Sequence, residues 1–178
     1  MVFQDFGLLP WRTTLHNIEM GLEFQGVKKE TRRKTALEMI DVVGLQGFER
    51  HYPHQLSGGM KQRVGIARAL TMSPESFYMD EPFASLDAQM REIMQEELLR
   101  IWSQFKTTVV FVTHSIDEAI YLSDRVIIMS ARPGRVKLEM NIPFSRPRIG
   151  VRATPEFAHL REDLWGILKT EIDYTRVR

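Results

Sequence analysis

Apolar residues repeat with two different periods along this chain, and together these periods predict a mixed α/β fold. Apolar positions three or four residues apart predict helices within residues 13–48, 64–70, 90–101 and 156–172. Short apolar or alternating runs predict strands at residues 77–79, 108–113, 124–130 and 136–142. Strands that alternate with helices favour a parallel sheet flanked by helices, and here a helix-rich segment comes first.

The longer predicted helices each bury one apolar face. Residues 28–43 form one helix with a basic, solvated first half, and Gly44 ends it. The predicted core positions of the three longest helices are Ala36, Leu37, Ile40, Val43, Met90, Ile93, Met94, Leu98, Ile101, Phe157, Leu160, Leu164, Ile167 and Leu168.

Two later segments predict turns and connections. Pro133-Gly134 has the residue order of a type II turn. Residues 143–155 are rich in proline and arginine and predict an ordered connection. Its arginines, Arg146, Arg148 and Arg152, could form an anion patch, but a solvated linker is favoured.

Candidate chemistry begins with the stretch QLSGGMKQRVGIAR at residues 55–68. Ser57 can cap the helix that follows, and Gly58 and Gly59 allow a ligand to approach the backbone closely. A helix N-terminus offers free N–H donors and partial positive charge, which suit a phosphate. Taken alone, this stretch favours the start of an ordinary capped helix over a phosphate site.

Polar residues also follow two of the predicted strands. Asp80 and Glu81 end the first apolar run, where open α/β sheets place their ligands. An unpaired charge is costly to bury, so two acids at this position favour a functional role. Ser85 and Asp87 come shortly afterwards, and His114 closes the second run.

This ordered set of motifs resembles the ATP-binding subunits of ABC transporters, over nearly the whole chain. The resemblance implies a P-loop-NTPase-like ABC ATPase fold: a partial parallel sheet with flanking helices, and an α-helical subdomain that carries the signature sequence. It implies one partial ATPase domain, with the helical subdomain at residues 13–70, the sheet-bearing part at 71–142 and a linker and helix at 143–178.

The resemblance also implies roles for the candidate residues, with ATP and Mg²⁺ as ligands. Gln4, in Gln4-Asp5-Phe6-Gly7, matches the Q-loop glutamine, which reaches the metal and the attacking water; from the residues alone it is a polar loop residue. The implied catalytic residues are Glu81, His114 and Gln4, and the implied metal ligands are Asp80 and Gln4. The implied nucleotide contacts are Ser57, Gly58, Gly59 and Gln62 of the signature and Ser85 and Asp87 of the D-loop.

The segments 8–11 and 130–136, and the end of the chain, resemble the nitrate, sulfonate and taurine branch of ABC importers. This resemblance implies a second ATPase subunit and two membrane permeases as partners, and a solute-binding protein as an indirect one. It implies a place on the inner face of the cell membrane. The transported solute is left open.

Composition agrees with this class of protein. The chain has 178 residues, 43% of them hydrophobic and 26% charged, which is ordinary for a globular domain. A net charge of +1 gives no indication of nucleic-acid binding, and the absence of cysteine fits a reducing compartment. No apolar run is long enough to span a bilayer, and residues 1–11 lack the pattern of a secretory signal, so we expect a cytoplasmic protein. His51 and His54 flank Pro53 without a nearby third ligand, which argues against a metal site.

The phosphate-binding sequence G-x-x-x-x-G-K-[ST] is missing from these 178 residues. Because that loop precedes the Q-loop in the family, we expect an N-terminally truncated sequence that alone is inactive. The alternative is a non-catalytic module that lends its signature to an intact ATPase partner. An ABC-type DNA repair protein is a third possibility, which the absence of long coiled-coil arms argues against.

Overall fold

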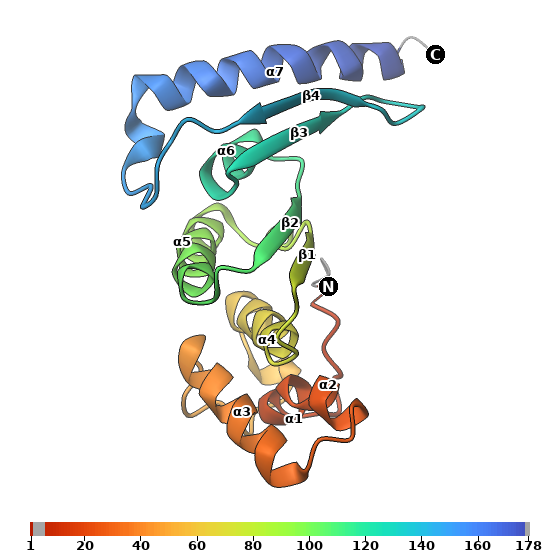
Figure 1. Ribbon diagram of the computed structural model, residues 1–178, viewed down its shortest axis with the longest axis vertical. Helices are drawn as coiled ribbons and strands as arrows, with labels where there is room; N and C mark the ends of the chain where they lie inside the picture. The colour runs from red at the N-terminus through yellow and green to blue at the C-terminus, as the bar shows by residue number, and fades with distance from the viewer. Residues whose placement is uncertain (2–5, 177–178) are drawn as a thin grey trace. The chain divides into compact units, whose positions relative to one another are not determined.

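A computed structural model describes Met1 and residues 6–176, with side chains placed through residue 170. The chain divides into two compact units, Met1–Val112 and Thr113–Arg178, which are considered separately (Figure 1). The mixed α/β class predicted from the sequence is confirmed.

The first unit begins with helices. They are α1 (Thr14–Ile18), α2 (Met20–Phe24), α3 (Lys29–Val42), a 3₁₀ turn at Pro53–Gln55, and α4 (Gly58–Leu70). Helix α4 packs against α1 and α3. Helix α3 ends at Gly44, as predicted: Gly44 has a φ of +64°, and the N–H of Leu45 donates to the Ile40 carbonyl oxygen at 3.0 Å. A left-handed glycine followed by this hydrogen bond is typical of a Schellman C-cap.

A parallel strand pair follows in the same unit. Strand β1 (Ser76–Asp80) pairs with β2 (Thr108–Val112), and helix α5 (Ala88–Phe105) connects them. Phe77 and Met79 point into the core, whereas Tyr78 lies on the opposite face, which is exposed. This is the parallel part of the predicted sheet, two strands wide among the residues described.

The predicted core of the first unit is confirmed at most positions, and Met90 is half-buried. Ala36, Ile40 and Val43 are buried, as are the three α5 residues Met94, Leu98 and Ile101. The prediction was wrong for Leu37 and Ile93, which are 39% and 52% exposed. Each lies one position beside the buried stripe of its helix, where an apolar side chain can stay in water at little cost.

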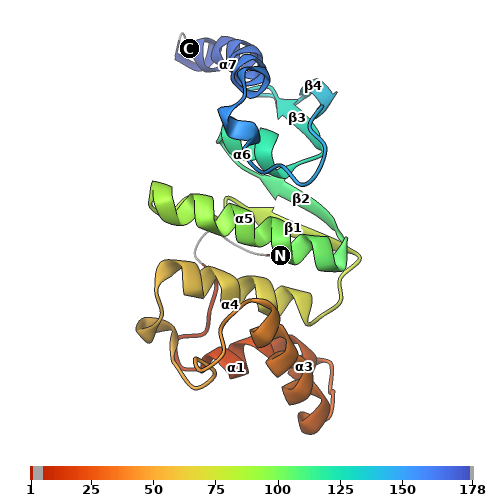
Figure 2. The ribbon, with the colours of Figure 1, turned by 90° about the vertical axis from the view of Figure 1, so that its left-hand side faces the viewer.

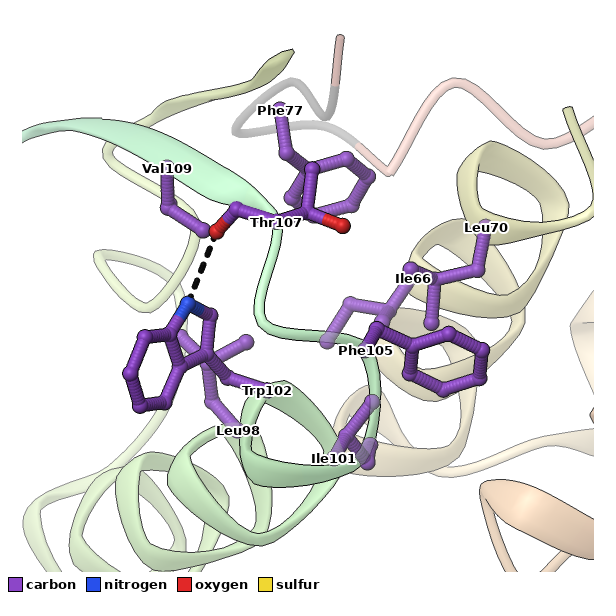
Figure 3. A pocket seen from close by; sticks show the side chains of 9 residues that line it. All are labelled: Ile66, Leu70, Phe77, Leu98, Ile101, Trp102, Phe105, Thr107 and Val109. Carbon is purple, nitrogen blue, oxygen red and sulfur yellow. Dashed lines mark hydrogen bonds between the residues drawn. The ribbon is translucent and has the colours of Figure 1, made fainter. Parts of the chain in front are cut away.

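Helices α4 and α5 and the strand pair also enclose a small apolar pocket (Figure 3). Ile66, Phe77, Leu98 and Trp102 are among its lining residues. The indole N–H of Trp102 donates to the Thr107 carbonyl oxygen at 2.8 Å. Since the lining offers no charged group to a phosphate, we interpret the pocket as a gap in core packing.

The second unit contains one helix–hairpin–helix arrangement. Helix α6 (Ile116–Leu122) leads into the antiparallel strands β3 (Arg125–Met129) and β4 (Val136–Asn141). A 3₁₀ turn (Val151–Ala153) precedes the long helix α7 (Pro155–Arg176), which packs against α6. The predicted core of α7 is confirmed at Phe157 and Leu164, which are buried, whereas Leu160, Ile167 and Leu168 are half-buried. The type II turn predicted at Pro133-Gly134 is wrong, because Gly134 does not adopt the positive φ that such a turn requires.

The connection before α7 is more buried than its sequence predicts. Arg148 is 3% exposed, so the prediction of a solvated side chain was wrong. Its guanidinium donates to the carbonyl oxygens of Ile120 (3.1 Å), Tyr121 (2.9 Å) and Ser123 (2.7 Å). These oxygens lie at the end of α6, where a helix leaves its last carbonyls without intrahelical donors.

The two other arginines of this connection also contact protein groups. Arg146 donates to the carboxylate of Asp124 at 2.9 Å and to the Leu122 carbonyl oxygen. The guanidinium carbon of Arg152 lies 3.8 Å from the centre of the Tyr121 ring, a cation–π contact. The three arginines therefore stabilise the second unit from within and do not form an anion patch.

A search of the described helices for a membrane span found none with the length and hydropathy that a bilayer crossing requires.

We predict that Arg148→Met lowers the free energy of unfolding of the second unit. The substitution leaves several buried carbonyl oxygens without a donor, at a cost of about 2–4 kcal/mol. Urea unfolding, with hydrogen exchange of the α6 amides, measures the loss. Arg125→Met is the matched control, because Arg125 and its partner Glu139 are both well exposed and their ion pair contributes little. Equal unfolding midpoints for the two variants would contradict the role assigned to Arg148.

Candidate functional site

The start of α4 is built as the sequence predicts. Ser57 has an extended backbone conformation, and its Oγ accepts a hydrogen bond from the N–H of Met60 at 3.3 Å. Ser57 is therefore the N-cap of α4, which confirms its capping role. Its side chain is exposed, whereas Gly59 is buried.

The two glycines of this stretch allow close packing against the next helix and the loop before it. A Cβ atom at Gly58 would lie 3.1 Å from Cδ2 of Leu86, and one at Gly59 would lie 2.8 Å from Sδ of Met90. The start of α4 thus lies directly against the start of α5, and Figure 2 shows the two helices side by side. The structure brings together the predicted signature and the predicted D-loop.

Asp80 and Glu81 lie where the sequence places them, at the carboxyl end of β1. Asp80 pairs in register with Val112, and the N–H of Glu81 donates to the Val112 carbonyl oxygen at 2.9 Å. Glu81 has a φ of +44°, an unfavourable conformation for a non-glycine residue. It opens a turn in which the Ala84 N–H donates to the Glu81 carbonyl oxygen at 3.1 Å. The two carboxylates therefore lie beside the loop that leads to α5.

That loop carries the remaining candidates of the first unit. Ser85 is exposed, and Asp87 is the N-cap of α5, with Oδ1 accepting from the Met90 N–H at 2.9 Å. Arg91 stabilises the loop by donating to the carbonyl oxygens of Phe83 (3.3 Å) and Leu86 (3.0 Å). Neither the N-cap at Asp87 nor the loop contacts of Arg91 were predicted from the sequence. An aspartate directly before an amphipathic run is the signal that could have revealed the cap.

Gln62 has a different environment from the other signature residues. Its side chain is fully buried within the first unit, and neither Oε1 nor Nε2 has a hydrogen-bond partner among the described residues. A buried amide without partners is costly. Its predicted contact with a nucleotide stays a prediction.

His114 belongs to the second unit, and its side chain is exposed. The residues on either side are fixed by the start of α6: Ser115 is the N-cap, and Thr113 Oγ1 donates to Glu118 Oε2 at 2.5 Å. Glu118 is buried, so this bond anchors the segment that presents His114. Gln4 lies outside the described residues.

Asp80 alone suits the predicted magnesium ion among the residues that the structure describes. In that part of the chain no three His, Cys, Asp or Glu side chains gather into a metal-binding group. Magnesium in nucleotide sites is commonly held by one or two carboxylates with waters and phosphate oxygens, so a half-exposed carboxylate at a strand end fits this ion.

Comparisons with known proteins show which family the chain resembles. A family model described as ABC transporter matches residues 1–84. An uncharacterized ABC transporter ATP-binding protein of Methanocaldococcus jannaschii is 55% identical over 172 residues, covering 97% of this chain and 64% of that protein. A taurine import ATP-binding protein of Rhizobium johnstonii is 46% identical over 179 residues, covering 97% of this chain and 68% of that protein. The chain therefore spans about two thirds of the length of these relatives.

A solved structure extends the likeness to the fold. A dimeric ATP-binding cassette bound to ADP and phosphate aligns with a TM-score of 0.65 and 38% identity, covering 81% of this chain and 62% of that one. The fold class predicted from the sequence is thereby confirmed.

We predict that Asp87→Ala lowers the stability of the first unit by about 1 kcal/mol, because α5 loses its N-cap. Asp87→Asn retains a capping oxygen, so we expect it to lower the stability of the first unit by less. Urea unfolding followed by far-UV circular dichroism measures both. Ser85→Ala is the control, since Ser85 is exposed in the same loop and has no capping role. A loss in Ser85→Ala as large as that in Asp87→Ala would contradict the assignment.

Proposed function

This chain belongs to the family of ABC transporter ATP-binding proteins, and from that membership we propose that it acts as the ATP-hydrolysing subunit of an importer. The proposed solute is a small anion such as nitrate, a sulfonate or taurine. The 46% identity with taurine import ATP-binding proteins supports this choice over other solutes.

The observation that carries the proposal is the contact between the start of α4 and the loop before α5. Gly58 packs on Leu86 and Gly59 on Met90, so Ser57, Ser85 and Asp87 lie on neighbouring segments. In the proposed dimer this surface faces the ATP held by the other subunit. The N–H groups at the start of α4 and the Ser57 hydroxyl would hydrogen-bond to its terminal phosphate.

The residues at the end of β1 supply the proposed hydrolytic chemistry. Asp80 would hold Mg²⁺, which neutralises charge that develops on the phosphates. Glu81 would accept a proton from the attacking water, a contribution of roughly 10²- to 10⁴-fold in rate. His114 would hold that water and the terminal phosphate in line. These roles require a phosphate-binding loop, called the cradle below, that holds the nucleotide in the same subunit. The 178 residues contain no G-x-x-x-x-G-K-[ST] sequence that could supply this loop.

The non-catalytic module is the second candidate function. It needs only the surface formed by Ser57, Gly58 and the loop before α5, which would close over ATP bound to an intact subunit.

The proposed membrane partner is a permease that contacts residues 8–12. Trp11 in this segment is 71% exposed, and a large exposed aromatic side chain is typical of a contact surface. Through the permease the protein would lie on the cytoplasmic face of the membrane, and a solute-binding protein would reach it only indirectly.

We predict that the purified 178-residue chain hydrolyses ATP at no more than the background rate, with or without Mg²⁺. Without a cradle the chain cannot hold the terminal phosphate beside Glu81. A coupled phosphate-release assay measures the rate, and Glu81→Gln is the control for contaminating ATPases. Steady turnover that disappears in Glu81→Gln would show that the chain holds the nucleotide by itself.

Uptake in cells tests the proposed function and separates it from the non-catalytic module. In a strain lacking the gene, uptake of labelled taurine, alkanesulfonate and nitrate is compared after complementation with the natural gene and its variants. The catalytic proposal predicts that Ser57→Arg and Glu81→Gln both fail to restore uptake of one of these anions. The non-catalytic module predicts that only Ser57→Arg fails. Glu139→Gln, on the exposed surface of β4, is the control that should restore uptake. Normal uptake of all three anions in the deletion strain would exclude them as solutes.

A further inference from the structure

The last turn of α4 holds a segment that lies about sixty residues earlier in the chain. The guanidinium of Arg68 donates to the carbonyl oxygen of Gly7 at 2.6 Å and to that of Phe6 at 3.0 Å. Both hydrogen bonds join a helix of the first unit to a loop of the same unit. Two adjacent carbonyl oxygens thus share one side chain.

The loop conformation at these two residues is unusual and needs support. Phe6 and Gly7 have φ values of +56° and +54°, so two consecutive residues are left-handed. For Phe6 this conformation is unfavourable, since its Cβ crowds the backbone. The left-handed pair turns both carbonyl groups toward Arg68, and the two hydrogen bonds offset the strain.

A second helix holds the other end of the same loop. The side chain of Asn17 in α1 accepts from the Leu9 N–H at 2.8 Å and donates to the carbonyl oxygens of Leu9 (3.1 Å) and Arg12 (2.9 Å). Asn17 is fully buried. The segment 6–12 is therefore attached at both ends to the pair of helices α1 and α4, which pack against each other.

Arginine is the side chain that this arrangement requires. Its planar guanidinium presents parallel N–H donors that match two neighbouring oxygens, whereas lysine offers a single nitrogen on a flexible stem. Arg68 is half-buried, and burial lowers its pKa from the ordinary value. The hydrogen bond to the Phe6 carbonyl oxygen is partly buried, whereas the one to Gly7 is exposed.

We propose that Arg68 is a positioning residue that fastens the segment 6–12 to the signature-bearing helix α4, so that the two move as one body. The inference rests on the proposed function, in which this segment meets the permease and the start of α4 meets ATP. Arg68 lies ten residues after Gly58, so a rigid helix of about 15 Å joins the two surfaces. A shift of α4 on closing over ATP would then displace the permease-facing segment through Arg68.

The chain contains no cysteine, so pairs of spin labels can be placed without removing native residues. Cysteines at Leu8 and Lys61 carry nitroxides on the segment and on the signature end of α4, and pulsed electron paramagnetic resonance gives their distance distribution. We expect a narrow distribution in the otherwise natural chain. Arg68→Met should broaden it roughly twofold, and Arg68→Lys nearly as much, because lysine cannot reproduce the paired donors.

Arg63→Lys is the matched control. Arg63 lies on the same helix and donates to the carbonyl oxygens of Val43 (3.3 Å) and Gly44 (3.4 Å), which belong to a different loop. Its substitution should leave the distribution narrow. The proposal is overturned if Arg68→Lys and Arg68→Met keep the natural width, or if Arg63→Lys broadens it equally, which would indicate general loosening of α4. Either result leaves the uptake assay, and so the proposed function, untouched.

Discussion

The close contact between the first turn of α4 and the start of α5 is the constraint on which the first unit depends. The absence of side chains at positions 58 and 59 makes this approach possible without moving a neighbour, since a Cβ at Gly59 would lie 2.8 Å from Met90 Sδ and would displace that side chain. That approach fixes the loop between β1 and α5, and the loop in turn fixes the residues that end β1. The same helix packs on α1 and α3, so its position sets both the helical part and the strand pair.

Hydrogen bonds from arginine to main-chain carbonyl oxygens hold the loops around this framework. Arg63, Arg68, Arg91 and Arg148 each donate to two or more carbonyl oxygens. Carbonyl groups in loops and at helix ends lack the hydrogen-bond donors that regular helices and strands supply. A planar guanidinium can donate to two such oxygens at once. This explains why Arg148, which the sequence places in a solvated linker, is buried in the protein. They stabilise irregular segments that a chain without disulfides must order by other means.

Periodicity predicted most helices and strands, because these elements depend on neighbours in sequence. The strands at 76–80 and 108–112 and the cap at Ser57 are local features, and Gly44 ends α3 as predicted. The turn predicted at Pro133-Gly134 was wrong although it is a local feature. A distant partner explains another failure: Arg148 is buried because α6, 25 to 28 residues earlier, presents its last carbonyl oxygens to it. Ile93 follows the helical period yet is exposed, since no segment covers that edge of α5 among the described residues. No local pattern could predict that Arg68 reaches Phe6 and Gly7.

The capping geometry also limits which hydrogen-bond donors at the start of α4 are free to bind a phosphate. The Ser57 hydroxyl already accepts from the Met60 N–H, and the Ser57 carbonyl oxygen accepts from that of Lys61. The earlier amides, those of Gly58 and Gly59, have no intrahelical acceptor. Gly59 is buried against Met90, so the more accessible amide of the pair is that of Gly58. If a nucleotide is held here, the Gly58 N–H and the exposed Ser57 hydroxyl proton are its natural donors. Both glycines allow α4 to pack closely on the start of α5, and in the proposed function Gly58 would also leave room for the ligand.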